Sequence, residues 1–319
     1  QSAFALFTQA LTSKNKAVPT IPPVLKITVQ GGVGTAEEHQ FLLDYYQVDA
    51  VGWGSPFLLV PEATSVDMET RNLLANAKEE DLYLSNISPL GVPFNTIKGT
   101  TNDFFKSQRI ASGKSGSSCP KRYLALSKEY KNEGSCTASK KHQDKKIEAL
   151  EAIRNTISHD AYAKEFSTIT EKSCLCVGLA NASHLELGIP IKGQAQGVVV
   201  CPGPNMAYFS KEVSLKDMIQ HIYGKKEIEN HANRPNMFVK ELDLYVSYLT
   251  NQINEALEIT PQQVKKWETF KTNLLNGISY YKLIFEKNKC FETSKEKFKN
   301  AILKIEIHLS ELEFKTTCV

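Results

Sequence analysis

Residues 26–38 read KITVQGGVGTAEE, and residues 49–57 read DAVGWGSPF. Each stretch is a short run containing β-branched residues that ends in glycines and then turns toward a helix. Glycine lets backbone N–H groups approach a ligand closely, and the N-terminus of the helix that follows favours negative charge. The two turns together therefore predict a cradle for a phosphate group.

The sequence around the two glycine turns alternates between strand and helix patterns. Residues 24–29 and 48–51 are expected to be strands. Between them, Thr35 is a suitable N-cap, and Glu37 and Glu38 fall in the first turn of a helix, where its dipole favours negative charge. Strand, glycine turn, helix and strand form one βαβ unit, which implies parallel pairing and a right-handed crossover.

The two glycine loops resemble those at the end of the FMN-binding (β/α)8 barrels, which include nitronate monooxygenases, IMP dehydrogenases and the synthase domain of glutamate synthases. In these barrels a GG(V/I)xT loop follows strand 7 and a G-x-G-(S/T) loop follows strand 8. Their backbone amides hold the flavin phosphate. The resemblance implies an FMN-dependent oxidoreductase with these cofactor-binding residues: Gly31, Gly32, Gly34, Thr35, Gly52, Trp53, Gly54 and Ser55.

The resemblance covers only residues 20–80. A barrel of about 250 residues needs six βα units before strand 7, and this sequence has only 23 residues before Val24. Three possibilities follow for this chain. It is the C-terminal part of a longer polypeptide, it completes a barrel together with another chain, or it has a smaller α/β fold that reuses the turn. The missing initial Met favours the first. Catalytic residues of such enzymes lie largely on the earlier strands, so none is assigned.

The chain is expected to be α/β and to contain the last two βα units of a (β/α)8 barrel. Three parts are expected along the sequence. They are a barrel-like segment with the phosphate-binding loops (residues 1–95), a cysteine-containing α/β region (residues 96–235) and a helical region (residues 236–319). In the second part we expect helices over residues 121–130 and 141–157 and a short strand over 197–200. In the third, residues such as Leu242 and Leu249 keep helical spacing, which predicts roughly three long helices.

Seven cysteines are present, and this odd number argues against a fully paired disulfide framework and favours a reducing cytoplasm. Thiolates on flexible loops are what zinc or an iron–sulfur cluster requires. Five cysteines in loop-like settings are therefore the candidate metal ligands: Cys119, Cys136, Cys174, Cys176 and Cys201. Their spacing matches no ferredoxin or zinc-ribbon pattern, so buried free thiols are the alternative. Cys290 and Cys318, in the helical part, are expected to be structural or exposed.

The bulk properties exclude two classes of partner. A net charge of +3 is too small to predict nucleic acid binding, and no run of about 18 apolar residues predicts a membrane span. We therefore expect a cytoplasmic segment of an FMN-dependent oxidoreductase, with an iron–sulfur centre or zinc on its cysteines and the rest of the barrel, or another subunit, as its partner.

Two alternatives to this function remain open. One is a non-redox subunit that binds a phosphorylated small molecule or assembles with a partner, with structural zinc or inert cysteines. The other is an enzyme that acts on phosphosugars or phosphate esters without flavin.

Overall fold

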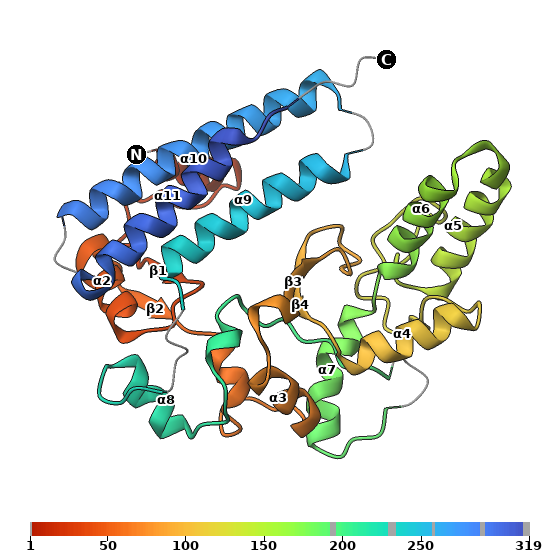
Figure 1. Ribbon diagram of the computed structural model, residues 1–319, viewed down its shortest axis with the longest axis horizontal. Coiled ribbons are helices and arrows are strands. Elements are labelled where there is room, and N and C mark those ends of the chain that lie inside the picture. Colours follow the sequence, from red (N-terminus) through yellow and green to blue (C-terminus); the bar gives the residue numbers. More distant parts are fainter. Residues whose placement is uncertain (1, 192–195, 229–233, 257–258, 288–290, 315–319) are drawn as a thin grey trace.

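The computed structural model of the chain describes residues 2–191, 196–228, 234–256, 259–287 and 291–314. The fold is mixed α/β and mostly helical (Figure 1). Strands occur in the described part as two small pairs. In the first pair, β1 (Thr28–Gln30) runs parallel to β2 (Ala50–Gly52), and α2 (Ala36–Tyr46) connects them. The expected βαβ unit is therefore confirmed, although residues 24–27 lie before β1 and not within it.

The start of α2 follows directly from its sequence. Thr35 Oγ1 accepts a hydrogen bond from the Glu38 amide, and the Glu38 carboxylate accepts one from the Thr35 amide, which is a capping box. Phe41 and Leu42 bury the apolar face of the helix. Gln47 then adopts a left-handed conformation, with φ of 52°, and ends it.

The second strand pair is a hairpin. β3 (Leu82–Ser85) pairs antiparallel with β4 (Phe94–Ile97), and the connection between them turns at Gly91, where φ is +72°. An antiparallel hairpin does not extend a parallel barrel sheet. The residues that the structure describes therefore contain one parallel βαβ unit and no closed barrel of their own.

Two local predictions in the cysteine-containing region are wrong. Residues 121–130 are not helical, because Arg122 has a positive φ and Ser127 exchanges two backbone hydrogen bonds with Ser135 in a hairpin-like turn. Residues 197–200, expected to be a strand, are buried but form no strand. The Val198 amide donates to Thr101 Oγ1 and the Val199 amide to the Gly178 carbonyl, so these groups bond to helical segments and not to a neighbouring strand.

Helices build most of the remaining N-terminal and central chain: α1 (Ser2–Ser13), α3 (Met68–Ala75), α4 (Thr101–Ala111), α5 (Lys140–Ala152), α6 (His159–Glu171), α7 (Leu175–Glu186) and α8 (Leu215–Ile222). Short 3-10 helices complete the described elements: η1 (Ser55–Leu59), η2 (Glu79–Asp81), η3 (Arg154–Thr156), η4 (Met206–Tyr208) and η5 (Glu292–Ser294). Several helices begin at side chains that cap the first turn: Asp67, Thr100, Ser139, Ser158 and Ser214.

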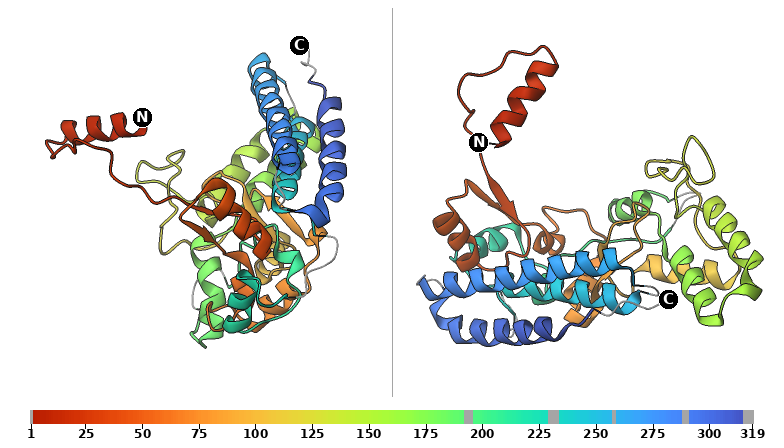
Figure 2. Two further views of the ribbon diagram at one scale, coloured as in Figure 1. Left: turned by 90° about the vertical axis from the view of Figure 1, so that its left-hand side faces the viewer. Right: turned by 90° about the horizontal axis from the view of Figure 1, so that it is seen from above.

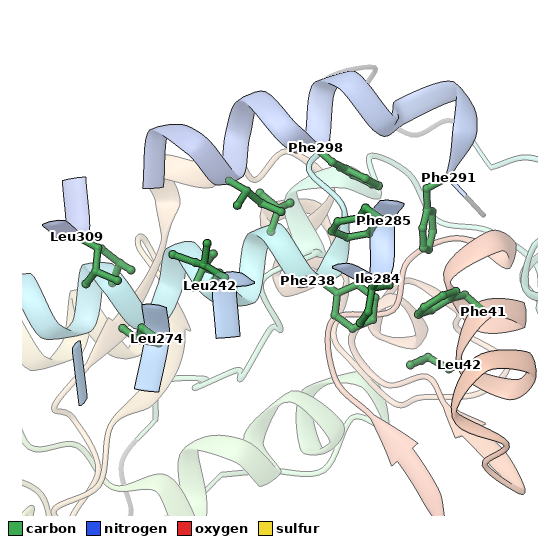
Figure 3. Close-up of a cluster of buried hydrophobic side chains, with 14 of the residues drawn as sticks. Phe41, Leu42, Phe238, Leu242, Leu274, Ile284, Phe285, Phe291, Phe298 and Leu309 are labelled. Atoms are coloured by element: carbon green, nitrogen blue, oxygen red, sulfur yellow. The ribbon is translucent and has the colours of Figure 1, made fainter. Parts of the chain in front are cut away.

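Three long helices form the C-terminal part, as predicted: α9 (Met237–Glu255), α10 (Pro261–Lys287) and α11 (Lys295–Glu311). Pro261 occupies the first helical position of α10, where its missing N–H has no cost. Buried side chains between these helices meet Phe41 and Leu42 of α2 (Figure 3). The helical part and the βαβ unit therefore share one hydrophobic core.

The N-terminal segment stands apart from this core. Figure 2 shows α1 away from the body, joined to β1 by an extended stretch. Apolar side chains on that stretch face solvent: Val24 is 97% exposed, and Leu25 and Ile27 are also exposed. Within the described residues, no helix combines the length and apolar character that crossing a membrane requires.

Candidate functional site

Both glycine turns open onto one hollow of about 220 Å³. The first turn contributes residues 30–33 and the second contributes residues 52–56. A third segment, residues 203–205, closes the hollow and was not predicted from the sequence. Six of the eight residues predicted to bind the cofactor line it: Gly31, Gly32, Gly52, Trp53, Gly54 and Ser55.

The glycines of this lining have two properties that matter for a ligand, a special backbone conformation and open space around the backbone. Gly31 and Gly32 have φ of +122° and +72°, a backbone conformation that other residues rarely adopt. A Cβ atom on Gly31 or Gly54 would meet nothing within 4 Å, so the backbone there borders open space. A ligand can therefore approach the backbone of both turns closely.

Gly34 and Thr35 lie just outside the hollow and have a different role. The Gly34 amide donates to Glu38 Oε2 at 2.9 Å, and the Thr35 amide donates to the same oxygen at 3.3 Å. The two amides just before α2 are thus engaged by a carboxylate of the protein itself. Any phosphate in the hollow would be held by the turns that line it, and not by these two amides.

A buried ion pair fixes the first turn. Arg234 Nη1 and Nη2 lie 2.8 and 2.9 Å from the two carboxylate oxygens of Glu38, a bidentate arrangement. The side chains are only 6% and 2% exposed. Arg234 Nη2 also donates to the Gly32 carbonyl at 3.0 Å and to Asn205 Oδ1 at 3.2 Å. A Cβ on Gly34 would lie 2.6 Å from Arg234 Nη2, so this glycine gives the guanidinium its space.

The ion pair joins segments that are distant in sequence. The Asn205 amide group donates to the Gly32 carbonyl, and the Met237 amide at the start of α9 donates to Glu38 Oε1 at 2.7 Å. Sequence reasoning placed Glu38 only as a helix-dipole residue and missed Arg234 and Asn205. The T-x-x-E capping box was visible in the sequence, but nothing local signalled an arginine 196 residues from its partner.

The second turn is held by hydrogen bonds of neutral groups. Trp53 Nε1 donates to His39 Nδ1 at 3.0 Å, and burial lowers the pKa of His39, so its ring stays neutral. The Ser55 hydroxyl accepts a bond of 2.6 Å from the Gly203 amide. His221 supports the first turn instead, since its Nε2 bonds the Gly34 carbonyl at 3.0 Å while its Nδ1 accepts from the Ile228 amide at 3.3 Å.

The lining of the hollow is uncharged and mixes polar and apolar groups. Its side-chain polar groups are those of Gln30, Trp53, Ser55 and Asn205, and its remaining surface is largely backbone and proline. Exposed backbone amides in glycine-rich turns are suited to bind an anion without a counter-charge. Among the described residues that line the hollow, none carries a carboxylate, imidazole, thiol or amine.

Four of the five candidate cysteines lie within electrostatic range of one another elsewhere in the fold. The Cys136 thiol interacts electrostatically with three other thiols, those of Cys119, Cys174 and Cys176. Burial raises the pKa of Cys136 to about 12, and repulsion from the other thiols adds to this shift. Within the described residues, no set of three or more Cys, His, Asp or Glu side chains is already placed to hold a metal ion.

The remaining cysteines are not part of this group. Cys201 is exposed and lies two residues before the segment that closes the glycine hollow. The predictions for Cys290 and Cys318 fall outside the described residues.

No protein-family model matches the chain, and no curated protein or solved structure matches it. The resemblance to FMN-binding barrels therefore rests on the two glycine loops alone.

Proposed function

We propose that the chain is the phosphate-binding end of an FMN-dependent oxidoreductase of the barrel type. The observation that carries this proposal is the convergence of two glycine turns on one uncharged hollow. Each turn follows one of the two parallel strands, β1 and β2. This is the arrangement in which barrels bind phosphate, with the loops after the last two strands forming the site.

The size of the hollow fits the phosphate end of the cofactor. Sites that enclose a whole ligand of drug size occupy about 300–1,000 Å³, whereas this hollow measures about 220 Å³. It would hold the phosphate and the adjoining part of the ribityl chain, and the ring system would extend beyond the described lining. When bound, the flavin supplies hydride or electron transfer, and this chain supplies placement.

The unpaired edges of the β1–β2 sheet favour the proposal that a partner supplies the other barrel strands. In the described part β1 and β2 pair only with each other, so each has an unpaired edge. The stretch before β1 exposes Val24, Leu25 and Ile27, which are apolar side chains suited to burial. A preceding segment of the polypeptide, or another subunit, would cover both the edge and these side chains.

Ligand binding by the full chain tests the proposal. FMN is expected to bind, inorganic phosphate to compete with it, and riboflavin, which lacks the phosphate, to bind far more weakly. Gly54→Leu places a side chain in the open space of the hollow and should abolish binding, because a Cβ there meets nothing within 4 Å. Gly277→Leu, at another open glycine on α10, is the matched control and should bind normally.

A second candidate function is a non-redox subunit that binds a phosphorylated metabolite. The small, uncharged hollow favours it, because a lining of glycine turns suits the binding of a phosphate group. Binding of phosphosugars with no preference for FMN would support this candidate and overturn the flavin proposal.

A further inference from the structure

The segment between α4 and α5, residues 112–139, is long and has no helix or strand of its own. It is nevertheless well buried at several positions, which include Ser115, Ser117 and Ala138. Loops longer than about 12–15 residues without secondary structure are usually functional when they are ordered. Together with the start of α5, this segment lines a hollow of about 540 Å³, whose described lining has no residue in common with the glycine hollow.

Backbone pairing holds one serine of this loop in a defined place. The backbones of Ser127 and Ser135 exchange two hydrogen bonds, of 3.0 and 2.7 Å. Gly134 makes this pairing possible, because its φ is +84° and a Cβ there would collide with the Ala125 carbonyl oxygen. Ser135 is thereby fixed in the wall of the hollow.

The Ser135 hydroxyl is hydrogen-bonded to a buried histidine. Its Oγ lies 2.9 Å from Nδ1 of His142, whose side chain is only 4% exposed. The other contact of this hydroxyl, with the Ser127 carbonyl at 3.3 Å, is longer. Since Ser135 lines the hollow, a molecule bound there meets a hydroxyl that an imidazole already contacts.

A carboxylate faces the second nitrogen of the imidazole. Glu129 Oε2 lies 3.7 Å from His142 Nε2, which is ion-pair range, and Lys146 Nζ holds the other carboxylate oxygen at 2.8 Å. The Tyr130 ring packs edge-on against the imidazole, with 5.1 Å between the ring centroids. The negative charge near Nε2 favours a proton on that nitrogen, which leaves Nδ1 to accept the bond from Ser135.

The imidazole is in the right protonation state to act as a base. Burial lowers the pKa of His142 in spite of the nearby Glu129, so the ring is neutral near pH 7. When the ring takes up a proton, the Glu129 carboxylate stabilises the resulting charge.

A serine hydroxyl, a neutral imidazole in contact with it and a carboxylate beside that imidazole are the three parts of a nucleophilic site. We propose that Ser135 is the nucleophile of an esterase site in this hollow, that His142 is its general base, and that Glu129 positions the imidazole. The proposal does not depend on phosphate binding in the glycine hollow.

The reaction needs no group beyond these residues, the ester and water. Ser135 Oγ attacks the ester carbonyl carbon while its proton moves to His142 Nδ1. The bond to the leaving alkoxide then breaks, and the alkoxide takes the proton from His142. A water molecule attacks the acyl-enzyme with the same histidine as base, which releases the acid and restores the serine hydroxyl.

The cations that line the hollow favour an ester whose acyl part carries a negative charge. Four basic residues line it, and no carboxylate belongs to its described lining: Arg122, Lys131, Lys140 and Lys141. Lys131 and Lys140 also form ion pairs at the surface. Arg122 Nη2 donates to the Gly134 carbonyl at 3.3 Å, so this guanidinium lies beside the nucleophile and is suited to bind a substrate carboxylate.

Labelling of the full chain with a fluorophosphonate probe tests the nucleophile. The serine oxygen forms a bond to phosphorus, fluoride leaves, and the hydroxyl proton passes through the imidazole to solvent. We expect peptide mass spectrometry to find the label on Ser135 and to find none at this position in Ser135→Ala. Ser127→Ala is the matched control and should be labelled normally, because its pairing with Ser135 uses backbone groups that the substitution keeps.

Labelling rates separate the base from the positioning residue. His142→Gln should slow the reaction by about 100-fold or more, the usual contribution of a general base. Glu129→Gln acts only through the imidazole, so it should lower the rate at saturating probe and leave the half-saturating probe concentration unchanged. Glu133→Gln, at an exposed carboxylate of the same loop, should change neither quantity. Far-UV circular dichroism checks that each variant is folded.

Hydrolysis of two para-nitrophenyl esters tests the substrate class. The mono-ester of glutaric acid carries a carboxylate and should react faster than the butyrate ester, which carries none. Arg122→Gln should remove this preference. Equal rates for the two esters with the wild-type chain would overturn the anionic substrate class.

Two results would overturn the proposal as a whole. One is a wild-type chain whose Ser135 stays unmodified by the probe, a result that requires no variant to fold. The other is hydrolysis of the glutarate ester by Ser135→Ala at the wild-type rate.

Discussion

Arg234→Met removes the cation from a carboxylate that is almost fully buried. Glu38 would keep its bonds from the backbone amides of Gly34, Thr35 and Met237 but lose both charge-assisted bonds at 2.8 and 2.9 Å. Breaking a buried pair by removing one partner costs about 3–5 kcal/mol. Because three amides still contact the carboxylate, we expect a loss near the lower end of that range, about 3 kcal/mol.

Urea unfolding followed by circular dichroism measures this loss as a lower midpoint with an unchanged slope. Lys282→Met is the matched control. Its ion pair with Glu306 is shorter, at 2.6 Å, but the two side chains are 42% and 29% exposed. Exposed pairs contribute about 0–1 kcal/mol. Equal losses in the two variants would refute the argument that burial makes the Arg234 pair important.

A double variant separates charge from packing. Glu38→Gln combined with Arg234→Met leaves no unpaired charge in the core, so it should be more stable than Arg234→Met alone. If the double variant is the less stable of the two, the loss in Arg234→Met does not arise from a buried unpaired carboxylate.

Three further predictions address the core, the turn and the pH dependence of stability. Ile278→Ala, at a fully buried position of α10, should lower the free energy of unfolding by about 2–5 kcal/mol. Leu303→Ala, on the exposed side of α11, should lower it far less. Denaturant titration measures both losses. Gly34→Ala should destabilise because its methyl group meets the guanidinium at 2.6 Å, whereas Gly54→Ala, which enters open space, should be well tolerated in thermal melts. Burial lowers the pKa of His39 in the folded state, so the unfolded chain binds more protons in acid than the folded chain does. The contribution of neutral His39 to the free energy of unfolding is therefore fully present above about pH 6.5. It is lost as the pH falls through the lowered pKa. His39→Gln should remove this part of the slope, and an identical pH profile in the variant would contradict the assignment.

Local sequence patterns predicted the elements that local interactions determine. The N-cap at Thr35 and the helical spacing of Leu242 and Leu249 both correspond to helices, because each signal lies at or within the helix that it predicts. Residues 121–130 and 197–200 were misassigned because long-range contacts decide their conformation. The Ser127–Ser135 pairing and the Gly178–Val199 bond have no counterpart in a short window of sequence.

The site was predictable where the two glycine turns form it. The two turns were visible as sequence motifs, since positive φ and close approach require that residue. Their support was not visible: Arg234, Asn205 and Gly203 reach the turns from distant parts of the chain. Among the cysteines, sequence could not separate Cys201 from the four thiols that lie within electrostatic range of one another, because loop context is alike for all five and only the fold places four in that range.

Phosphorus NMR of FMN titrated with the full chain tests the central claim most directly, because it observes the group that the glycine hollow is proposed to hold. The account predicts a shifted and broadened phosphate resonance that inorganic phosphate reverses and that Gly54→Leu abolishes. A phosphate resonance that stays unchanged at saturating protein concentration, or that shifts equally with Gly54→Leu, would contradict the account.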